Sequence, residues 1–261
     1  MSSSFTHRGT GGDYNLDVLR GLVPGHSMVS INGFNDAAST TIGTIGPGMV
    51  AGYEIDQGTI DGTPAAVIVG STSAADNGST ATGALTARVI GLNSSGVAAT
   101  EDVTLDGQTG VTTSATWSAI NGLRVLTWGS GKTNAGNLWV GTGALSVGIP
   151  AVRIFSALAG HSKGLTAYYV VPAGKTLYLR RFNTTLAQAT KAIDISVEVS
   201  TDSGINFITE ALFGIESGGP FVGKVIGTPG IAAGSHIRIR GLMEASTAIV
   251  TAILACELID N

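Results

Sequence analysis

The chain has little cysteine, and this scarcity limits how it can be held together. Its 261 residues include one cysteine, Cys256. A disulfide within the chain and a metal site built from several thiolates are therefore both excluded. Stability must come from packing, from the pairing of strands or from assembly.

Charge is also scarce, since only 12% of the residues are Asp, Glu, Lys or Arg. The 14 basic residues are outnumbered by 18 acidic ones, and they form no cluster beyond the pair Arg180 and Arg181. Nucleic-acid affinity depends on cations that neutralise phosphates. We therefore expect no nucleic-acid partner for this chain, whose net charge is -4.

Long apolar runs are missing as well. No stretch of 18 apolar residues occurs, and the first residues do not combine a basic leader with an apolar segment. We expect a soluble product made in a cytoplasm, with no membrane partner.

Glycine and small residues take the place of what is missing. The chain has 38 glycines, about twice the usual share, yet 43% of its residues are hydrophobic. Disordered chains combine low hydrophobicity with high net charge, so this one is expected to fold. Its length suffices for one large or two modest domains.

Alternating patterns in the second half predict strands. In "IDISVEVS" (193–200), apolar and polar residues alternate, which predicts a half-buried strand with one wet side. "TLYLRRF" (176–182) and "HIRIR" (236–240) repeat this alternation, and His236 is expected to start its strand. "AIVTAILACELI" (248–259) is apolar at nearly every position, which predicts a central strand buried on both faces.

Strand-like runs recur every 8 to 15 residues or so without amphipathic helices between them, which favours an antiparallel all-β fold. We predict two β-sandwich (jelly-roll-like) domains behind an extended N-terminal arm. The predicted parts are an arm over 1–62, a first sandwich domain over 63–145, a linker over 146–163 and a second sandwich domain over 164–261.

"GSGKTNAG" (129–136) contains the tripeptide that ends a phosphate-binding loop. Such a loop needs a glycine five residues before the Gly-Lys-Thr, and here that position is Leu126. A helix must also follow, yet "NAGNLWVGTG" predicts a strand. The same tripeptide recurs at Gly174, Lys175 and Thr176. We therefore predict a hairpin loop with Lys132 exposed at its tip.

Other catalytic and metal-binding patterns are absent from the sequence. The histidines His7, His26, His161 and His236 lack metal-ligand spacing, and no G-x-S-x-G motif occurs. The adjacent Glu101 and Asp102 would point to opposite faces of a strand. We predict no enzyme activity, catalytic residue, cofactor, metal or small-molecule substrate.

Two features leave alternatives open. The aspartates Asp56, Asp61, Asp76 and Asp106 lie in glycine-rich turns, where a turn role outweighs a weak calcium site. Trp117, Trp128 and Trp139 are spaced by eleven residues. Core or interface packing is the favoured role for these aromatics, and a platform for carbohydrate is the alternative.

The segment "ARVIGLNSSGVAATEDVTLDGQTGVTTSATWSAINGLRVLTWGSGKTNAG" (87–136) resembles a group of virion structural proteins of tailed bacteriophages. The resemblance extends to "LVPGHSMVSINGFN" (22–35), to "YYVVPAGKTLYLRRF" (168–182) and to the final "ELIDN". It implies a non-enzymatic component of the virion, made in the host cytoplasm. Within this group we expect a capsid decoration or cement protein, a homotrimer whose partners are the major capsid protein and its own copies.

The arm supplies the expected partner-binding residues. Isolated large side chains in an extended segment cannot bury themselves, but they can fill pockets of a neighbouring subunit. The predicted contact residues are Phe5, Tyr14, Leu19, Val23, Met28 and Phe34. The alternative is a tail or fibre component that binds host-surface glycans through Trp128 and Trp139.

Overall fold

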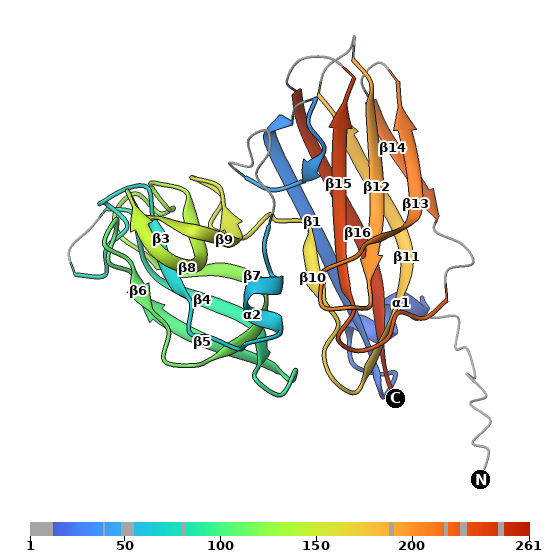
Figure 1. The fold of residues 1–261 in the computed structure, drawn as a ribbon, viewed down its shortest axis with the longest axis horizontal. Coiled ribbons are helices and arrows are strands. Elements are labelled where there is room, and N and C mark those ends of the chain that lie inside the picture. Colours follow the sequence, from blue (N-terminus) through green and yellow to red (C-terminus); the bar gives the residue numbers. More distant parts are fainter. Residues whose placement is uncertain are drawn as a thin grey trace.

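The chain is all-β, as the sequence predicts. The computed structural model describes residues 13–38, 40–47, 55–79, 82–187, 191–216, 219–224, 229–244 and 248–261. Within these ranges the chain forms sixteen strands and two short helices. The strands are grouped in four small antiparallel sheets, which lie in two groups in Figure 1.

Two of the sheets come mainly from the second half of the chain. Sheet I has the order β1 (His26–Ala38), β16 (Ala248–Asp260), β11 (Lys175–Leu186) and β14 (Gly219–Lys224). Sheet II has the order β10 (Tyr168–Val170), β15 (His236–Met243), β12 (Ile193–Ser200) and β13 (Ile208–Ile215), with β2 (Gly43–Thr44) pairing with β15.

The other two sheets come from the middle of the chain. Sheet III has the order β6 (Val111–Thr112), β3 (Ile68–Ser71), β8 (Leu138–Ser146) and β9 (Ile149–Ala157). Sheet IV has the order β5 (Ala98–Thr104), β4 (Ala84–Asn93) and β7 (Trp117–Trp128). The helices are α1 (Tyr14–Leu19) and α2 (Gly58–Asp61).

Buried side chains gather in two main clusters that follow these pairs of sheets. One cluster joins strands of sheets I and II, with Phe182 and Val250 from the first and Ile195 and Ile239 from the second. The other joins sheets III and IV, and Trp117 is fully buried in it. Figure 1 shows the two groups of strands side by side.

The predicted arm over 1–62 is wrong for its middle portion, because residues 26–38 form β1. This strand pairs with β16 from His26↔Ile259 to Ala38↔Ala248. Ile31 and Ala38 enter the core shared by sheets I and II. The small residue Gly33 lets β1 approach Ala167 and Ile45, where a Cβ would lie only 2.6 Å from their atoms.

The predicted linker over 146–163 is also wrong in part. Residues 149–157 form β9, which pairs with β8 and buries Ile154 and Phe155. The turn at Val147 and Gly148 takes positive φ angles of 49° and 75°, so the chain reverses there and stays in sheet III. Glycine at the second position makes this conformation cheap.

Two predictions about strand faces need correction. β16 is central, between β1 and β11, but only one of its faces is buried along nearly its whole length. On the other face Glu257 is buried, whereas Ile249 and Ile253 remain 41% and 40% exposed. Conversely, the polar face of β12 is mostly buried, and of its four polar residues only Asp194 is exposed. Glu198 is 7% exposed, because Arg238 pairs with it at 2.7 Å and Phe207 stacks on the Arg238 guanidinium.

Two side-chain amides make paired hydrogen bonds with the backbone close to where the two groups of strands meet. Asn121 on β7 donates to the carbonyl of Val170 on β10 at 2.9 Å and accepts from its N–H at 2.8 Å. Gln57, beside α2, binds both backbone groups of Ile120 in the same manner, at 2.6 and 2.9 Å. Each side-chain amide thus makes the two hydrogen bonds that a neighbouring strand would make with that backbone, at a place where no strand pairs with it.

Candidate functional site

The loop "GSGKTNAG" has no capacity left for a phosphate. It connects β7 and β8, and Lys132 is exposed there with a φ of 56°, as predicted for a loop tip. The N–H groups of Ala135 and Gly136 donate to the carboxylate of Asp76 at 2.8 and 2.9 Å. Asp76 is fully buried and also accepts from Ala84 N–H at 2.7 Å. An internal carboxylate therefore occupies the donors that a phosphate would need.

The other turn aspartates also serve the fold. Asp56 accepts from the Thr59 N–H and hydroxyl at 3.0 and 2.7 Å, and Asp106 accepts from the Asn77 side chain at 2.9 Å. Across the described ranges, no three His, Cys, Asp or Glu side chains gather as metal ligands would.

The three tryptophans differ in exposure. Trp117 and Trp139 are core residues, 0% and 2% exposed, which the favoured packing role predicts. Trp128, at the end of β7, is 44% exposed. A carbohydrate platform made jointly by Trp128 and Trp139 is therefore wrong, whereas Trp128 alone is accessible.

The structure separates the predicted contact residues of the arm. Phe5 lies outside the described residues. Leu19 is 67% exposed, whereas Val23 and Met28 are half-buried. Phe34 stacks on His161 with the ring centroids 5.7 Å apart, so it joins β1 to the segment after β9.

Tyr14 is held by a polar cluster at the base of sheet I. Its hydroxyl donates to Glu257 Oε1 at 2.5 Å, and His26 Nδ1 lies 2.8 Å from the same oxygen. Arg180 pairs with Glu257 Oε2 at 2.9 Å. Three segments, α1, the start of β1 and β11, are thus fastened to one carboxylate on β16. We call these four residues the Glu257 cluster.

The charges of the cluster follow from its bonds. Burial on its own raises the pKa of Glu257, but the bonds from Tyr14 and His26 and the charge of Arg180 outweigh it, so the pKa lies below its usual value. Burial and the bond to Glu257 raise the pKa of Tyr14 to about 12. Glu257 is therefore ionised and Tyr14 neutral at neutral pH. Sequence reasoning missed this cluster, although a lone glutamate in an apolar run was its signal.

The Glu257 cluster orients a leucine face on α1. Asp13 caps the helix by accepting from Asn15 N–H at 3.0 Å, and Val18 is buried. Leu16 and Leu19 on α1 and Leu22 in the turn after it are exposed, at 47%, 67% and 64%. We call these three residues the leucine face. It is a compact apolar area on a short element whose position is fixed.

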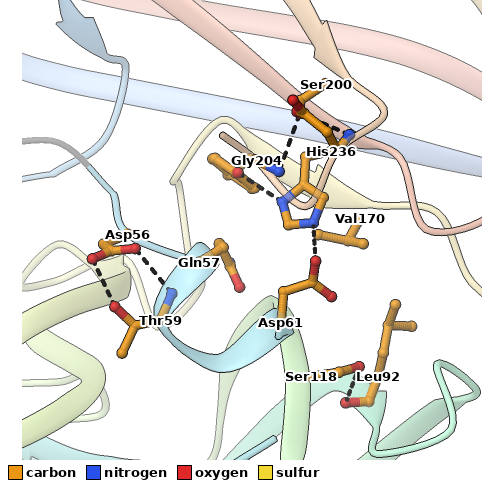
Figure 2. A network of polar contacts seen from close by, with 12 residues as sticks. Asp56, Gln57, Thr59, Asp61, Leu92, Ser118, Val170, Ser200, Gly204 and His236 are labelled. Atoms are coloured by element: carbon orange, nitrogen blue, oxygen red, sulfur yellow. Dashed lines mark hydrogen bonds and ion pairs between the residues drawn. The ribbon is translucent and has the colours of Figure 1, made fainter. Parts of the chain in front are cut away.

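A second polar network lies where α2 meets sheet II (Figure 2). His236 starts β15, as predicted, and is fully buried. Its Nε2 lies 3.1 Å from Asp61 Oδ2, and its Nδ1 lies 2.9 Å from the Tyr168 hydroxyl. Since a carboxylate only accepts, Nε2 carries the proton and Nδ1 accepts from Tyr168.

This network resembles a catalytic Asp-His pair only in composition. Catalysis by such a pair needs a nucleophile within reach of the imidazole. The hydroxyl within reach of His236 is that of Tyr168, and both side chains are buried, 0% and 3% exposed, where a substrate does not reach them. Burial lowers the pKa of His236, and the nearby Asp61 only partly opposes this effect. A neutral imidazole therefore connects α2 to sheet II.

No helix among the described residues is long and apolar enough to span a bilayer. No family model, curated protein or solved structure matches this chain.

Proposed function

We propose that the protein is a non-enzymatic structural protein of a bacteriophage virion, and that it decorates and stabilises the capsid shell. The observation that carries the proposal is the leucine face, which presents three exposed leucines next to the N-terminal segment. The resemblance of residues 22–35, 87–136 and 168–182 to phage virion proteins supplies the class of partner, the major capsid protein.

The energetics favour a contact through this face. Full burial of a leucine contributes roughly 1.5–3 kcal/mol, and Leu16, Leu19 and Leu22 each leave about half or more of that unrealised in the single chain. The Glu257 cluster holds α1 in place before binding, which lowers the ordering cost that association imposes. A shell subunit with a matching apolar pocket would gain both effects.

We also propose that the four sheets form two β-sandwiches. We describe sheets I and II as one β-sandwich and sheets III and IV as a second, because each pair shares one main hydrophobic cluster. The sandwiches would assemble as a homotrimer on the shell. A solution mass equal to a single chain, measured by light scattering, would contradict the trimer.

The test uses two matched substitutions of exposed apolar residues. Leu19 on the leucine face is 67% exposed, and Val147 in the β8–β9 turn is 63% exposed. Leu19→Ser and Val147→Ser should both fold, because neither side chain contributes to a core. Co-sedimentation with shells of the same virus should fall roughly tenfold for Leu19→Ser and stay unchanged for Val147→Ser.

Equal loss for both variants, or no loss for the triple variant Leu16→Ser, Leu19→Ser, Leu22→Ser, would remove the leucine face from the account. Failure of the unaltered protein to bind shells at all would remove the decoration function itself.

A second candidate function rests on Trp128. A tail or fibre component that binds host-surface glycans needs an accessible aromatic ring, and Trp128 provides one. Binding of the unaltered protein to tails but not to shells would favour this alternative.

A further inference from the structure

A groove of about 550 Å³ lies between the two groups of strands. We call it the junction groove. Its walls come from β1, from β4 and β7, and from the segment 161–169 that includes the start of β10. Volumes of 300 to 1,000 Å³ or so are typical of sites for small ligands. The groove uses neither the leucine face nor the Glu257 cluster.

The charged side chains that line this groove are cationic. Arg124 and Lys163 line it, both are exposed, and no Asp or Glu is among the lining residues. Their backbones form an antiparallel bridge, so two cations stand opposite each other. In the described part of the chain, neither has an ion-pair partner. Such a pair is unfavourable by itself, and an anion between the two side chains would relieve it.

A third cation in the same row of side chains, Arg88, does have an ion-pair partner. Arg88 on β4 is in register with Arg124 on β7. Arg88 is neutralised by Asp102 through two bonds, at 2.6 and 2.8 Å. Arg88, beside the groove, thus has a carboxylate partner, whereas Arg124 and Lys163 in the groove have none among the described residues. This holds although the net charge of the chain is -4.

The groove also holds an oriented aromatic ring. The Trp128 indole N–H donates to Ser162 Oγ at 3.0 Å, which fixes the ring. β1 contributes Ser30 and Asn32 to the lining, and these supply hydroxyl and amide groups. An apolar ring face combined with nearby polar groups fits a pyranose ring, which has both apolar C–H and hydroxyl surfaces.

We infer that the junction groove binds an anionic saccharide, with its carboxylate or phosphate between Arg124 and Lys163 and a sugar ring on Trp128. A nucleic-acid strand fits less well, since strand-binding grooves carry several stacking aromatics and a broad positive track. Trp128 is the one exposed Trp, Tyr or Phe among the lining residues of this groove. The inference does not depend on whether the protein sits on the shell or the tail.

Calorimetric titration of the full chain tests this inference. The probes are trigalacturonate, sialyllactose and glucose 6-phosphate, with α-1,4-galactotriose, lactose and glucose as the uncharged sugars for comparison. At least one acidic probe should bind at least tenfold more tightly than its counterpart, because charge-assisted bonds to Arg124 and Lys163 add to its affinity. Raising the salt concentration should weaken this binding.

The variants separate the groove from general surface charge. Arg124→Gln with Lys163→Gln should weaken binding of the acidic probe roughly tenfold or more, and Trp128→Ala should weaken it as well. Arg20→Gln removes an exposed cation at the C-cap of α1 and should leave binding of the acidic probe unchanged. Leu19→Ser should keep saccharide binding, and the groove variants should keep shell binding.

Three results would overturn the inference. They are absence of binding for all three acidic probes, equal binding of acidic and uncharged sugars, and acidic-sugar binding that survives the double substitution at Arg124 and Lys163. Tighter binding of adenosine monophosphate than of every acidic sugar, lost in Trp128→Ala, would assign the groove to nucleotides instead.

Discussion

At the scale of single residues, buried carboxylates connect separate segments of this chain. Asp76 and Glu257 are 0% and 2% exposed, and each binds groups from several segments. An acceptor in this position costs little only while all its donors are present. Replacement of one such carboxylate should therefore weaken the contacts of several segments and lower the free energy of unfolding.

Glu257→Gln should destabilise the protein. The amide keeps the shape of the side chain but removes the charge that Arg180 and His26 bind, so we expect a loss of about 1–3 kcal/mol in the free energy of unfolding. Urea unfolding measures it. Asp102→Asn breaks the exposed pair with Arg88 and serves as control, with a clearly smaller change expected. Equal changes in both variants would show that the Glu257 cluster contributes no more than a surface pair.

His236 makes stability depend on pH in a defined direction. Its pKa is lowered in the folded state, so the unfolded chain binds a proton more readily. Stability should therefore fall as the pH drops below about 6.5, the usual histidine value, and continue falling down to the folded pKa. Urea midpoints of the protein and of His236→Gln, compared from pH 8 to pH 5, isolate this residue.

The stability advantage of the unaltered protein over His236→Gln should shrink on acidification. An advantage that grows as the pH falls would mean that His236 is protonated in the folded state, contrary to the network with Asp61 and Tyr168.

At the scale of elements, the antiparallel strands were predictable from sequence and their neighbours were not. The alternation in 193–200 and 236–240 predicts β12 and β15, and turn residues predict the hairpin at Lys132. β1 escaped prediction because its inward positions include Gly33 and Asn35, which give no apolar alternation. Its burial depends on pairing with β16, more than 200 residues away in sequence.

The site was predictable only in part, for the same reason. The threefold spacing of Leu16, Leu19 and Leu22 in the sequence indicates a short helical segment, and Trp128 was a candidate from its type. The Glu257 cluster and the facing cations Arg124 and Lys163 arise from long-range pairing. No local pattern places Arg124 opposite Lys163, because their bridge depends on how the segment after β9 returns to β7.

Asn121→Asp tests the contact between β7 and β10. The carboxylate still accepts from Val170 N–H but cannot donate to its carbonyl, so we expect a loss of about 1–3 kcal/mol. The control is Asn93→Asp, whose side chain only accepts, from Ser95 and Val97 N–H. Thermal unfolding should show a lower midpoint for Asn121→Asp alone. An equal shift in the control would mean that added charge, rather than the lost donor, is responsible.

Deletions test where the folded part begins. Removal of residues 1–12 serves as the control, because it keeps every pairing of β1 with β16, and the shortened chain should fold. Removal of residues 1–38 should abolish folding, since it strips β1 from β16 and exposes the apolar face around Leu254. Circular dichroism with size-exclusion chromatography distinguishes the two. A folded 1–38 deletion would restore the idea of a dispensable arm.

At the scale of the whole molecule, the protein has two separate surfaces for binding, the leucine face and the junction groove. Figure 1 places α1, which carries Leu16 and Leu19 of the leucine face, beside the lower end of sheet I. The lining residues of the junction groove come from both groups of strands. A shell protein with this layout could hold its partner at one place and remain open to ligands at the other. Variants at either place should therefore act independently.

A single introduced cysteine can be labelled specifically to locate the protein on a particle. Cys256 is fully buried, and burial raises the pKa of its thiol, so it should not react with a maleimide in the folded protein. Lys132→Cys would place a reactive thiol on an exposed loop tip between β7 and β8.

The most direct test is electron microscopy of virions that carry Lys132→Cys labelled with maleimide gold. The account predicts gold distributed over the capsid shell, and no gold on virions with the unaltered chain treated in the same way. Gold confined to the tail or its fibres, or absent from purified virions that contain the variant chain, would contradict the proposed decoration of the shell.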